Sequence, residues 1–242
     1  MKRPWRVCLF GLVALGSALA FMPAAVVGWQ LEKFSANRLR VLNSQGTIWA
    51  GQLGLGLVNH NRVYAIDGPL QWRVSAPSTH GLSLELTHAK LPQPVHALWS
   101  PKGLRIDEGA LHAPASWLAA WGAPFNTIRP EGVLQLNWKS WEAGGAVNLR
   151  LTWLDAQSAL ASIRPLGEYV VAITGVPNQR LDIQLRSNKG PLMLEGQGHK
   201  VGNQAWVFNG YASAQAGSQA ALTGFLSQMG KQEGGRYRLN VF

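Results

Sequence analysis

Val147-Asn148-Leu149-Arg150-Leu151-Thr152-Trp153 is a strict alternation of apolar and polar side chains. A period of two residues is typical of a β-strand, in which successive side chains point to opposite faces of the sheet. We therefore expect Leu149, Leu151 and Trp153 to face the core, and Arg150 and Thr152 to face out.

The same alternation recurs on both sides of this stretch, at residues 53–57, 70–74, 82–86, 134–138, 181–185 and 237–241. We count about ten to twelve such segments, mostly five to seven residues long, at the close spacing of hairpins. Short helices are expected at Pro114–Trp121 and at Gln219–Met229, where Ser218 suits the N-cap and Gly230 the end. The sequence predicts a mainly β fold, an antiparallel meander with two or three short helices.

A loose internal repeat runs through these strands, from a turn glycine to a strand tryptophan. It is visible at Gly68 to Trp72, Gly132 to Trp138 and Gly145 to Trp153. Two interpretations stay open: ordinary punctuation of a β protein, or two related halves at about 46–122 and 130–242.

An uncharged apolar run of 21 residues, Val7–Val27, follows the basic residues Lys2, Arg3 and Arg6. As one helix, rising about 1.5 Å per residue, it could cross a hydrocarbon core of roughly 30 Å. The positive-inside rule would keep residues 1–6 in the cytoplasm. We expect a transmembrane signal-anchor at 7–27, a membrane-proximal linker at 28–45 and a periplasmic β-rich domain at 46–242.

The alternative is a secretory signal that is cleaved after Ala18-Leu19-Ala20, a small-x-small site. The apolar run continues to Val27, which favours the retained anchor. Both interpretations export the rest of the chain.

Composition limits the classes of protein that the chain can belong to. The net charge is +10, but the Lys and Arg residues are dispersed and form no nucleic-acid recognition motif. A basic domain beside a membrane is attracted to anionic headgroups or acidic partners. The single cysteine, Cys8, rules out a disulfide within the chain, so packing and backbone pairing must supply the stability.

Motifs that carry chemistry are absent from the sequence. It contains no His-Glu-x-x-His, no Gly-x-Ser-x-Gly and no Walker A pattern, and its six histidines are scattered. We therefore expect no catalytic, cofactor-binding or metal-binding residues and no small-molecule substrate. Of the eleven tryptophans, Trp117, Trp121 and Trp141 are the candidates for exposed anchors of a protein–protein interface.

Two short motifs and the end of the chain resemble one known family. Gly46-Thr47-Ile48-Trp49-Ala50-Gly51, then Gly68-Pro69-Leu70-Gln71-Trp72-Arg73, with the helix at Gln219–Met229 before Gly234–Leu239, are similar to type II secretion system protein N. The resemblance implies an accessory component of the bacterial inner membrane, without enzyme activity or cofactor. Such a component would scaffold the export of folded periplasmic proteins. Its expected partners are the inner-membrane platform proteins and, as a further candidate, the outer-membrane secretin.

A second resemblance keeps another function open. Envelope proteins of the AsmA type share Gly-x-(Val/Ile)-Trp turns, and they imply an apolar sheet face that holds or passes lipids. A periplasmic hydrolase is disfavoured by the lack of a catalytic constellation.

Overall fold

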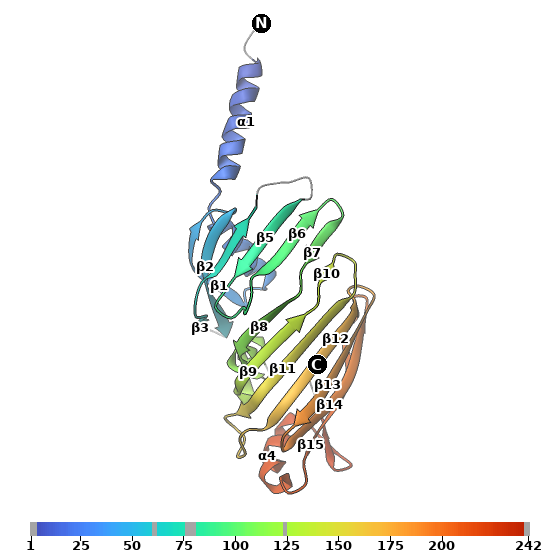
Figure 1. Ribbon diagram of the computed structural model, residues 1–242. Helices are drawn as coiled ribbons and strands as arrows, with labels where there is room; N and C mark the ends of the chain where they lie inside the picture. The colour runs from blue at the N-terminus through green and yellow to red at the C-terminus, as the bar shows by residue number, and fades with distance from the viewer. Residues whose placement is uncertain (1–3, 60–61, 76–80, 123–124, 240–242) are drawn as a thin grey trace. The chain divides into compact units, whose positions relative to one another are not determined.

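The computed structural model describes residues 4–59, 62–75, 81–122 and 125–239 (Figure 1). The chain divides into two compact units, residues 1–89 and 90–242. The first contains α1 (Pro4–Ala20), α2 (Ala25–Phe34), β1 (Leu39–Gly46), β2 (Ala50–Asn59), β3 (Arg62–Ala65), β4 (Leu70–Val74) and β5 (Leu82–Thr87). The second contains β6 (Val95–Ser100), β7 (Gly103–Ile106), β8 (Gly109–Pro114), the 3-10 helix η1 (Ala115–Trp121), α3 (Phe125–Ile128), β9 (Pro130–Trp138), β10 (Trp141–Glu142), β11 (Val147–Ser158), β12 (Gly167–Val176), β13 (Arg180–Lys189), β14 (Leu192–Val201), β15 (Val207–Ala214), α4 (Gln219–Met229), β16 (Gln232–Glu233) and β17 (Arg236–Arg238). The mainly β, antiparallel fold is confirmed.

The first unit is an antiparallel sheet with α2 packed against it. Strands β1, β2, β4 and β5 lie in that order, and β3 pairs with the far end of β2 beside β4. The core consists of Ala24, Leu53, Leu55 and Trp72, with Val27 and Leu31 of α2 packed against it. The alternation of Leu53, Leu55 and Leu57 therefore reports a sheet face that α2 covers.

The apolar run Val7–Val27 is not one helix, contrary to the expectation for a transmembrane segment. α1 ends at Ala20, and α2 begins at Ala25. Between them Pro23, which cannot donate a helical hydrogen bond, forms a β-bridge with Thr47. Among the residues that the structure describes, no helix is both long enough and apolar enough to cross a membrane. Residues 1–3 of the basic N-terminus lie outside those residues.

Residues 28–45, expected to be a linker, carry most of α2 and nearly all of β1. The strand pairs with β2 along its length, from Leu39 opposite Leu57 to Gly46 opposite Gly51. Gly28 is buried in the helix, and a Cβ there would lie 3.0 Å from Val41. Close helix–strand packing thus makes this segment part of the first unit.

The second unit is built on a nine-stranded antiparallel sheet in the order β16-β17-β15-β14-β13-β12-β11-β9-β8. β11 is 12 residues long and β12, β13 and β14 are 10 each, longer than the five to seven that the alternation suggested. Leu151 pairs with Leu136 and Val171, while Arg150 pairs with Asn137 and Ala172. The alternation along β11 is therefore the predicted one, but Leu149 and Leu151 are half-buried, and only Trp153 of the three predicted residues packs against the buried core.

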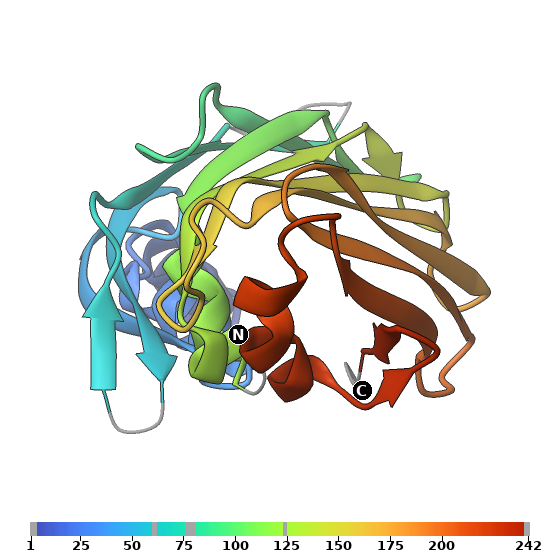
Figure 2. The ribbon, with the colours of Figure 1, turned by 90° about the horizontal axis from the view of Figure 1, so that it is seen from below.

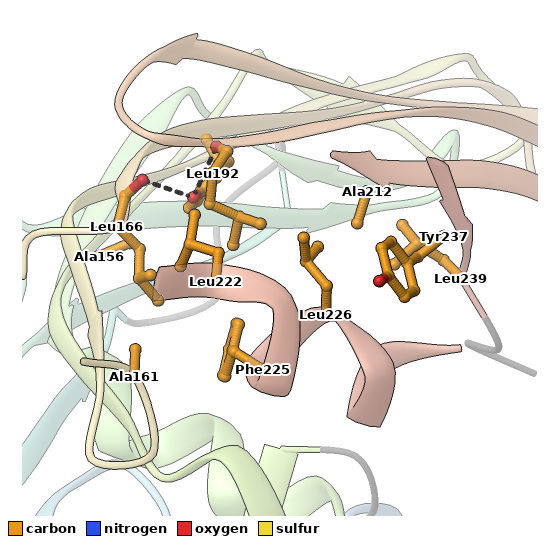
Figure 3. Packing of buried hydrophobic residues seen from close by; sticks show 11 residues of the cluster. Ala156, Ala161, Leu166, Leu192, Ala212, Leu222, Phe225, Leu226, Tyr237 and Leu239 are labelled. Carbon is orange, nitrogen blue, oxygen red and sulfur yellow. Dashed lines mark hydrogen bonds between the residues drawn. The ribbon is translucent and has the colours of Figure 1, made fainter. Parts of the chain in front are cut away.

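α4 lies on the concave side of this sheet (Figure 2). Its range is the one expected from sequence, and Leu222, Phe225 and Leu226 are its buried residues. In Figure 3, Leu222 and Leu226 point toward the strands and Phe225 lies toward Ala161. The rest of the cluster is Ala156, Leu166, Tyr169, Leu192, Ala212, Tyr237 and Leu239.

Tyr169 lies in this core with its hydroxyl group buried. It donates to the carbonyl oxygens of Leu166 and Leu192, each at 3.0 Å (Figure 3). Burial raises the pKa of Tyr169, because the phenolate would lose its hydration. The centroid of the Trp153 ring lies 5.9 Å from the centroid of the Tyr169 ring.

The helix expected at Pro114–Trp121 is a 3-10 helix that begins one residue later, at Ala115. Pro114 belongs to β8, where it pairs with Val133. Proline at the end of an edge strand needs no donor, so the residue suits the strand as well as a helix start.

Candidate interaction surface

Strands β6, β7 and β10 carry an apolar face in the second unit. Trp99 lies opposite Leu104, and Ala97 lies opposite Ile106. Ile106 in turn pairs with Trp141 on β10. Since directly opposed residues of an antiparallel pair share a face, all five side chains lie on one side of these three strands.

Exposure distinguishes these residues. Trp99 is 65% exposed and Leu104 is 38% exposed, whereas Ile106 and Trp141 are half-buried. A water-exposed indole beside an exposed leucine is unfavourable for an isolated molecule. Large aromatic side chains of this kind are enriched among the residues that anchor protein interfaces.

Polar contacts fix the opposite face and the ends of these strands. Arg105, on the other side of β7 from Trp99, pairs with Asp107 at 3.1 Å and with Glu142 at 3.9 Å. The Trp138 indole donates to the Asp107 carbonyl oxygen at 2.9 Å. The Arg105–Glu142 pair joins β7 to β10 beside their backbone pairing, whereas the Arg105–Asp107 pair lies within one stretch of chain.

The three tryptophans expected at an interface do not lie together. Trp141 joins Trp99 on the β6-β7-β10 face, and its indole donates to the Gly145 carbonyl oxygen at 3.1 Å. Trp117 is half-buried on η1. Trp121 ends η1, and its side chain lies outside the described residues.

Sequence reasoning missed Trp99. Pro92, Pro94 and Pro101 by themselves indicate a connection or an edge across residues 91–101, and the structure places the strand β6 at Val95–Ser100. The signal was present, because Val95, Ala97 and Trp99 alternate with His96 and Leu98. Leu98 obscured it by placing an apolar side chain on the face of Arg105.

The Gly46–Gly51 motif forms the β1–β2 turn, where it organises the first unit. Trp49 donates from its indole to the Leu19 carbonyl oxygen at 3.0 Å, at the end of α1. Ile48 N–H donates to Met22 and Ala24 N–H donates to Gly46, which closes the junction between the two helices.

The second motif completes this turn. Trp72 pairs with Gly51, and its indole donates to the Ile48 carbonyl oxygen at 3.0 Å. A Cβ at Gly51 would lie 2.6 Å from the Trp72 ring, so glycine is required for the ring to lie over the backbone. The two motifs that carry the family resemblance are therefore one structural unit.

Two further ion pairs of the nine-stranded sheet are Arg180–Asp182, in which both side chains are exposed, and Lys189–Glu168, in which the lysine is exposed and the glutamate half-buried. The hydrogen bond from Arg180, at 3.0 Å, holds the pKa of Asp182 below its usual range. The Asn188 amide, with Lys189, lowers the pKa of Glu168. In the described part of the chain no three His, Cys, Asp or Glu side chains gather as a metal site.

The fold defines a class: a mainly β protein built of antiparallel sheets with few short helices. Comparison with known proteins gives the family. The family model of type II secretion system (T2SS) protein N matches residues 37–240, and the chain belongs to that family. No curated protein and no solved structure matches the chain. The chain is thus a type II secretion accessory protein with an expected place in the bacterial envelope, and its family is not known for enzyme activity.

Proposed function

We propose that the protein scaffolds a type II secretion system at the inner membrane through protein–protein contacts. The observation that carries this proposal is the 65% exposed Trp99, which lies opposite Leu104 on the paired strands β6 and β7. Its partners would be the inner-membrane platform proteins and the outer-membrane secretin. The mechanism needs no cofactor: burial of the indole in a partner's pocket supplies affinity, and the polar rim supplies orientation.

Crosslinking in the native host tests this surface. A photoreactive phenylalanine in place of Trp99 should crosslink to a secretion component identified by mass spectrometry. The matched control carries the same group at Arg150, which is exposed on the polar face of β11. Equal crosslinking from both positions, or none from Trp99 in an active secretion strain, would remove the proposed contact.

Membrane anchoring by α1 is part of the same proposal. Every side chain from Leu9 to Ala20 is exposed, including Phe10 at 78% and Leu15 at 70%, which water disfavours on all sides of a helix. α1 has 17 residues, and a helix shorter than the bilayer core can be accommodated by local thinning and by snorkelling basic flanks. The N-terminus would be cytoplasmic and the bulk of the chain periplasmic.

Carbonate extraction of envelopes tests the anchor. The full chain should stay with the membrane, and a chain that lacks residues 2–20 should be released. N-terminal sequencing separates the anchor from a cleaved signal, since cleavage would give a start near Phe21. Release of the full chain by carbonate would contradict anchoring.

A second candidate function, lipid holding, is favoured by two cross-strand rows of half-buried apolar side chains on the nine-stranded sheet. One row is Leu136, Leu151, Val171 and Leu185; the other is Trp138, Leu149, Ile173 and Ile183. α4 covers the neighbouring row at Tyr169 and Ala212. Stoichiometric phospholipid in native mass spectrometry, with no crosslink from Trp99, would favour this function over scaffolding.

A further inference from the structure

α2 has two faces of different chemistry. Its inner face buries Ala24 and Gly28 and packs Val27 and Leu31 on the sheet. Its outer face exposes Val26 at 37%, Trp29 at 53% and Phe34 at 87%. A helix that already contacts the sheet on one side thus leaves large apolar side chains in water on the other.

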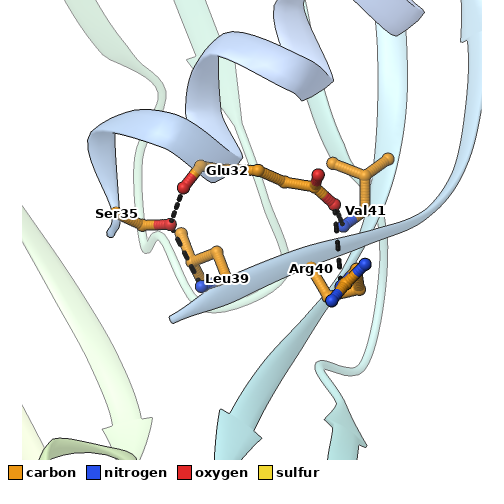
Figure 4. Close-up of polar contacts among 5 residues, drawn as sticks. All are labelled: Glu32, Ser35, Leu39, Arg40 and Val41. Atoms are coloured by element: carbon orange, nitrogen blue, oxygen red, sulfur yellow. Dashed lines mark hydrogen bonds and ion pairs between the residues drawn. The ribbon is translucent and has the colours of Figure 1, made fainter. Parts of the chain in front are cut away.

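The charges of α2 are also sorted between these faces. Its only acidic residue, Glu32, turns toward β1, where its carboxylate accepts from the Val41 N–H at 2.8 Å and pairs with Arg40 at 4.0 Å (Figure 4). Ser35 donates to the Glu32 carbonyl oxygen and accepts from the Leu39 N–H (Figure 4). These bonds occupy outward N–H groups of β1 and leave the outer face of α2 without an acidic side chain.

The outer face carries a cation instead. Lys33 lies with its Nζ 3.6 Å from the centroid of the Trp29 ring. The ammonium therefore lies over the face of the indole, a cation–π contact, and tryptophan and lysine are both common at the headgroup level of a bilayer. The chain's net charge of +10 favours an anionic surface.

Continuity with α1 orients this face. Only residues 21–24 separate the helices, and backbone bonds from Ala24 to Gly46 and from Ile48 to Met22 hold them to the β1–β2 turn. Phe21, between the two helices, is 78% exposed. No free linker therefore separates the apolar helix from the amphipathic one.

We propose that the outer face of α2, formed by Val26, Trp29, Lys33 and Phe34, is a membrane-docking surface that lies in the headgroup region of an anionic bilayer. The proposal rests on the anchoring of α1 proposed above. Apolar burial supplies attraction, and Lys33 contacts lipid phosphate. Docking would hold the first unit in contact with the membrane surface, whereas α1 alone would only tether the unit to the membrane.

Depth-dependent fluorescence quenching tests the surface. The full chain carries Cys8→Ser and one new cysteine, Phe34→Cys or Val26→Cys, labelled with nitrobenzoxadiazole. It is reconstituted in vesicles of 70% phosphatidylcholine and 30% phosphatidylglycerol. We expect blue-shifted emission and at least twofold stronger quenching by 5-doxyl than by 12-doxyl lipid.

Tyr64→Cys is the matched control, because Tyr64 is 53% exposed on β3 of the same unit. Its label should keep an aqueous emission and be quenched by neither lipid. Adding Lys33→Glu should weaken quenching at position 34 in anionic vesicles and leave it unchanged in pure phosphatidylcholine.

Flotation of the same vesicles separates the two proposals. Protein that does not float overturns the anchoring by α1 and, with it, the docking surface. Protein that floats while the labels at 26 and 34 behave like the label at 64 overturns the docking surface alone.

Discussion

Aromatic rings placed over glycines recur at the residue scale. Trp72 covers Gly51, Trp138 covers Gly109, and Phe208 covers Gly196. In each case, a Cβ atom added to the glycine would lie closer to the aromatic ring than side-chain atoms pack in proteins. From sequence, a strand glycine either weakens the strand or permits a close approach, and the ring that lies over each of these glycines comes from a neighbouring strand.

Gly109→Ala should destabilise the second unit by about 1–3 kcal/mol, since the Trp138 ring must move from its place and strain the bond to Asp107. The control is Gly224→Ala in α4, where nothing lies within 4 Å and alanine should stabilise the helix by about 0.5–1 kcal/mol. Urea unfolding checks both; the same sign for both substitutions would contradict the ring–glycine account.

Tyr169→Phe should lower the free energy of unfolding by about 1–3 kcal/mol, because two buried carbonyl oxygens lose their donor. Tyr64→Phe, at an exposed position, should change it little. Thermal unfolding of both variants provides the comparison, and equal losses would show that the hydroxyl contributes nothing.

The raised pKa of Tyr169 adds a pH dependence with a defined sign. The folded state keeps the proton that an unfolded tyrosine releases near about pH 10, so stability is complete below that pH and falls as pH rises above it. The difference between the wild-type protein and Tyr169→Phe should therefore shrink in urea titrations above about pH 10. A difference that stays constant there would be inconsistent with the burial of the phenol.

At the element scale, alternation predicted the strands well where one face is covered. β11 and α4 have the expected faces, because core packing repeats in the sequence with the period of the element. Two elements were misjudged. β6 was hidden by flanking prolines and by Leu98, and the junction of α1 and α2 depends on a β-bridge from Pro23 to Thr47 that no local pattern encodes.

Leu151→Asp should destabilise the protein by about 3 kcal/mol, since it places a charge on the apolar face between Leu136 and Val171. Arg150→Glu, one residue away and exposed, should stay within about 0.5 kcal/mol. Chemical denaturation measures both. Similar losses from the two variants would mean that the faces of β11 are misassigned.

At the scale of the whole molecule, the family followed from motifs whose structural reason appears only in three dimensions. Trp49 and Trp72 meet at one turn and hold the end of α1, so the spacing between the two motifs is the length of chain that returns from β2 to β4. The candidate interaction surface could not be predicted completely from the sequence. The sequence suggested Trp141 as one of three candidates, whereas the place of Trp99 beside Leu104 depends on how β6 pairs with β7.

Topology is the prediction that concerns the entire chain. Alkaline phosphatase, which needs disulfides formed outside the cytoplasm, should be active when fused after Ala89, where the first compact unit ends, and after Phe242. The basic residues Lys2, Arg3 and Arg6 set this orientation, because positive flanks stay inside. Replacing all three with glutamate should therefore lower the activity of both fusions several-fold at equal protein levels. Stable but inactive fusions of the wild-type chain would show that the β units remain in the cytoplasm, and scaffolding on the periplasmic side would then be impossible.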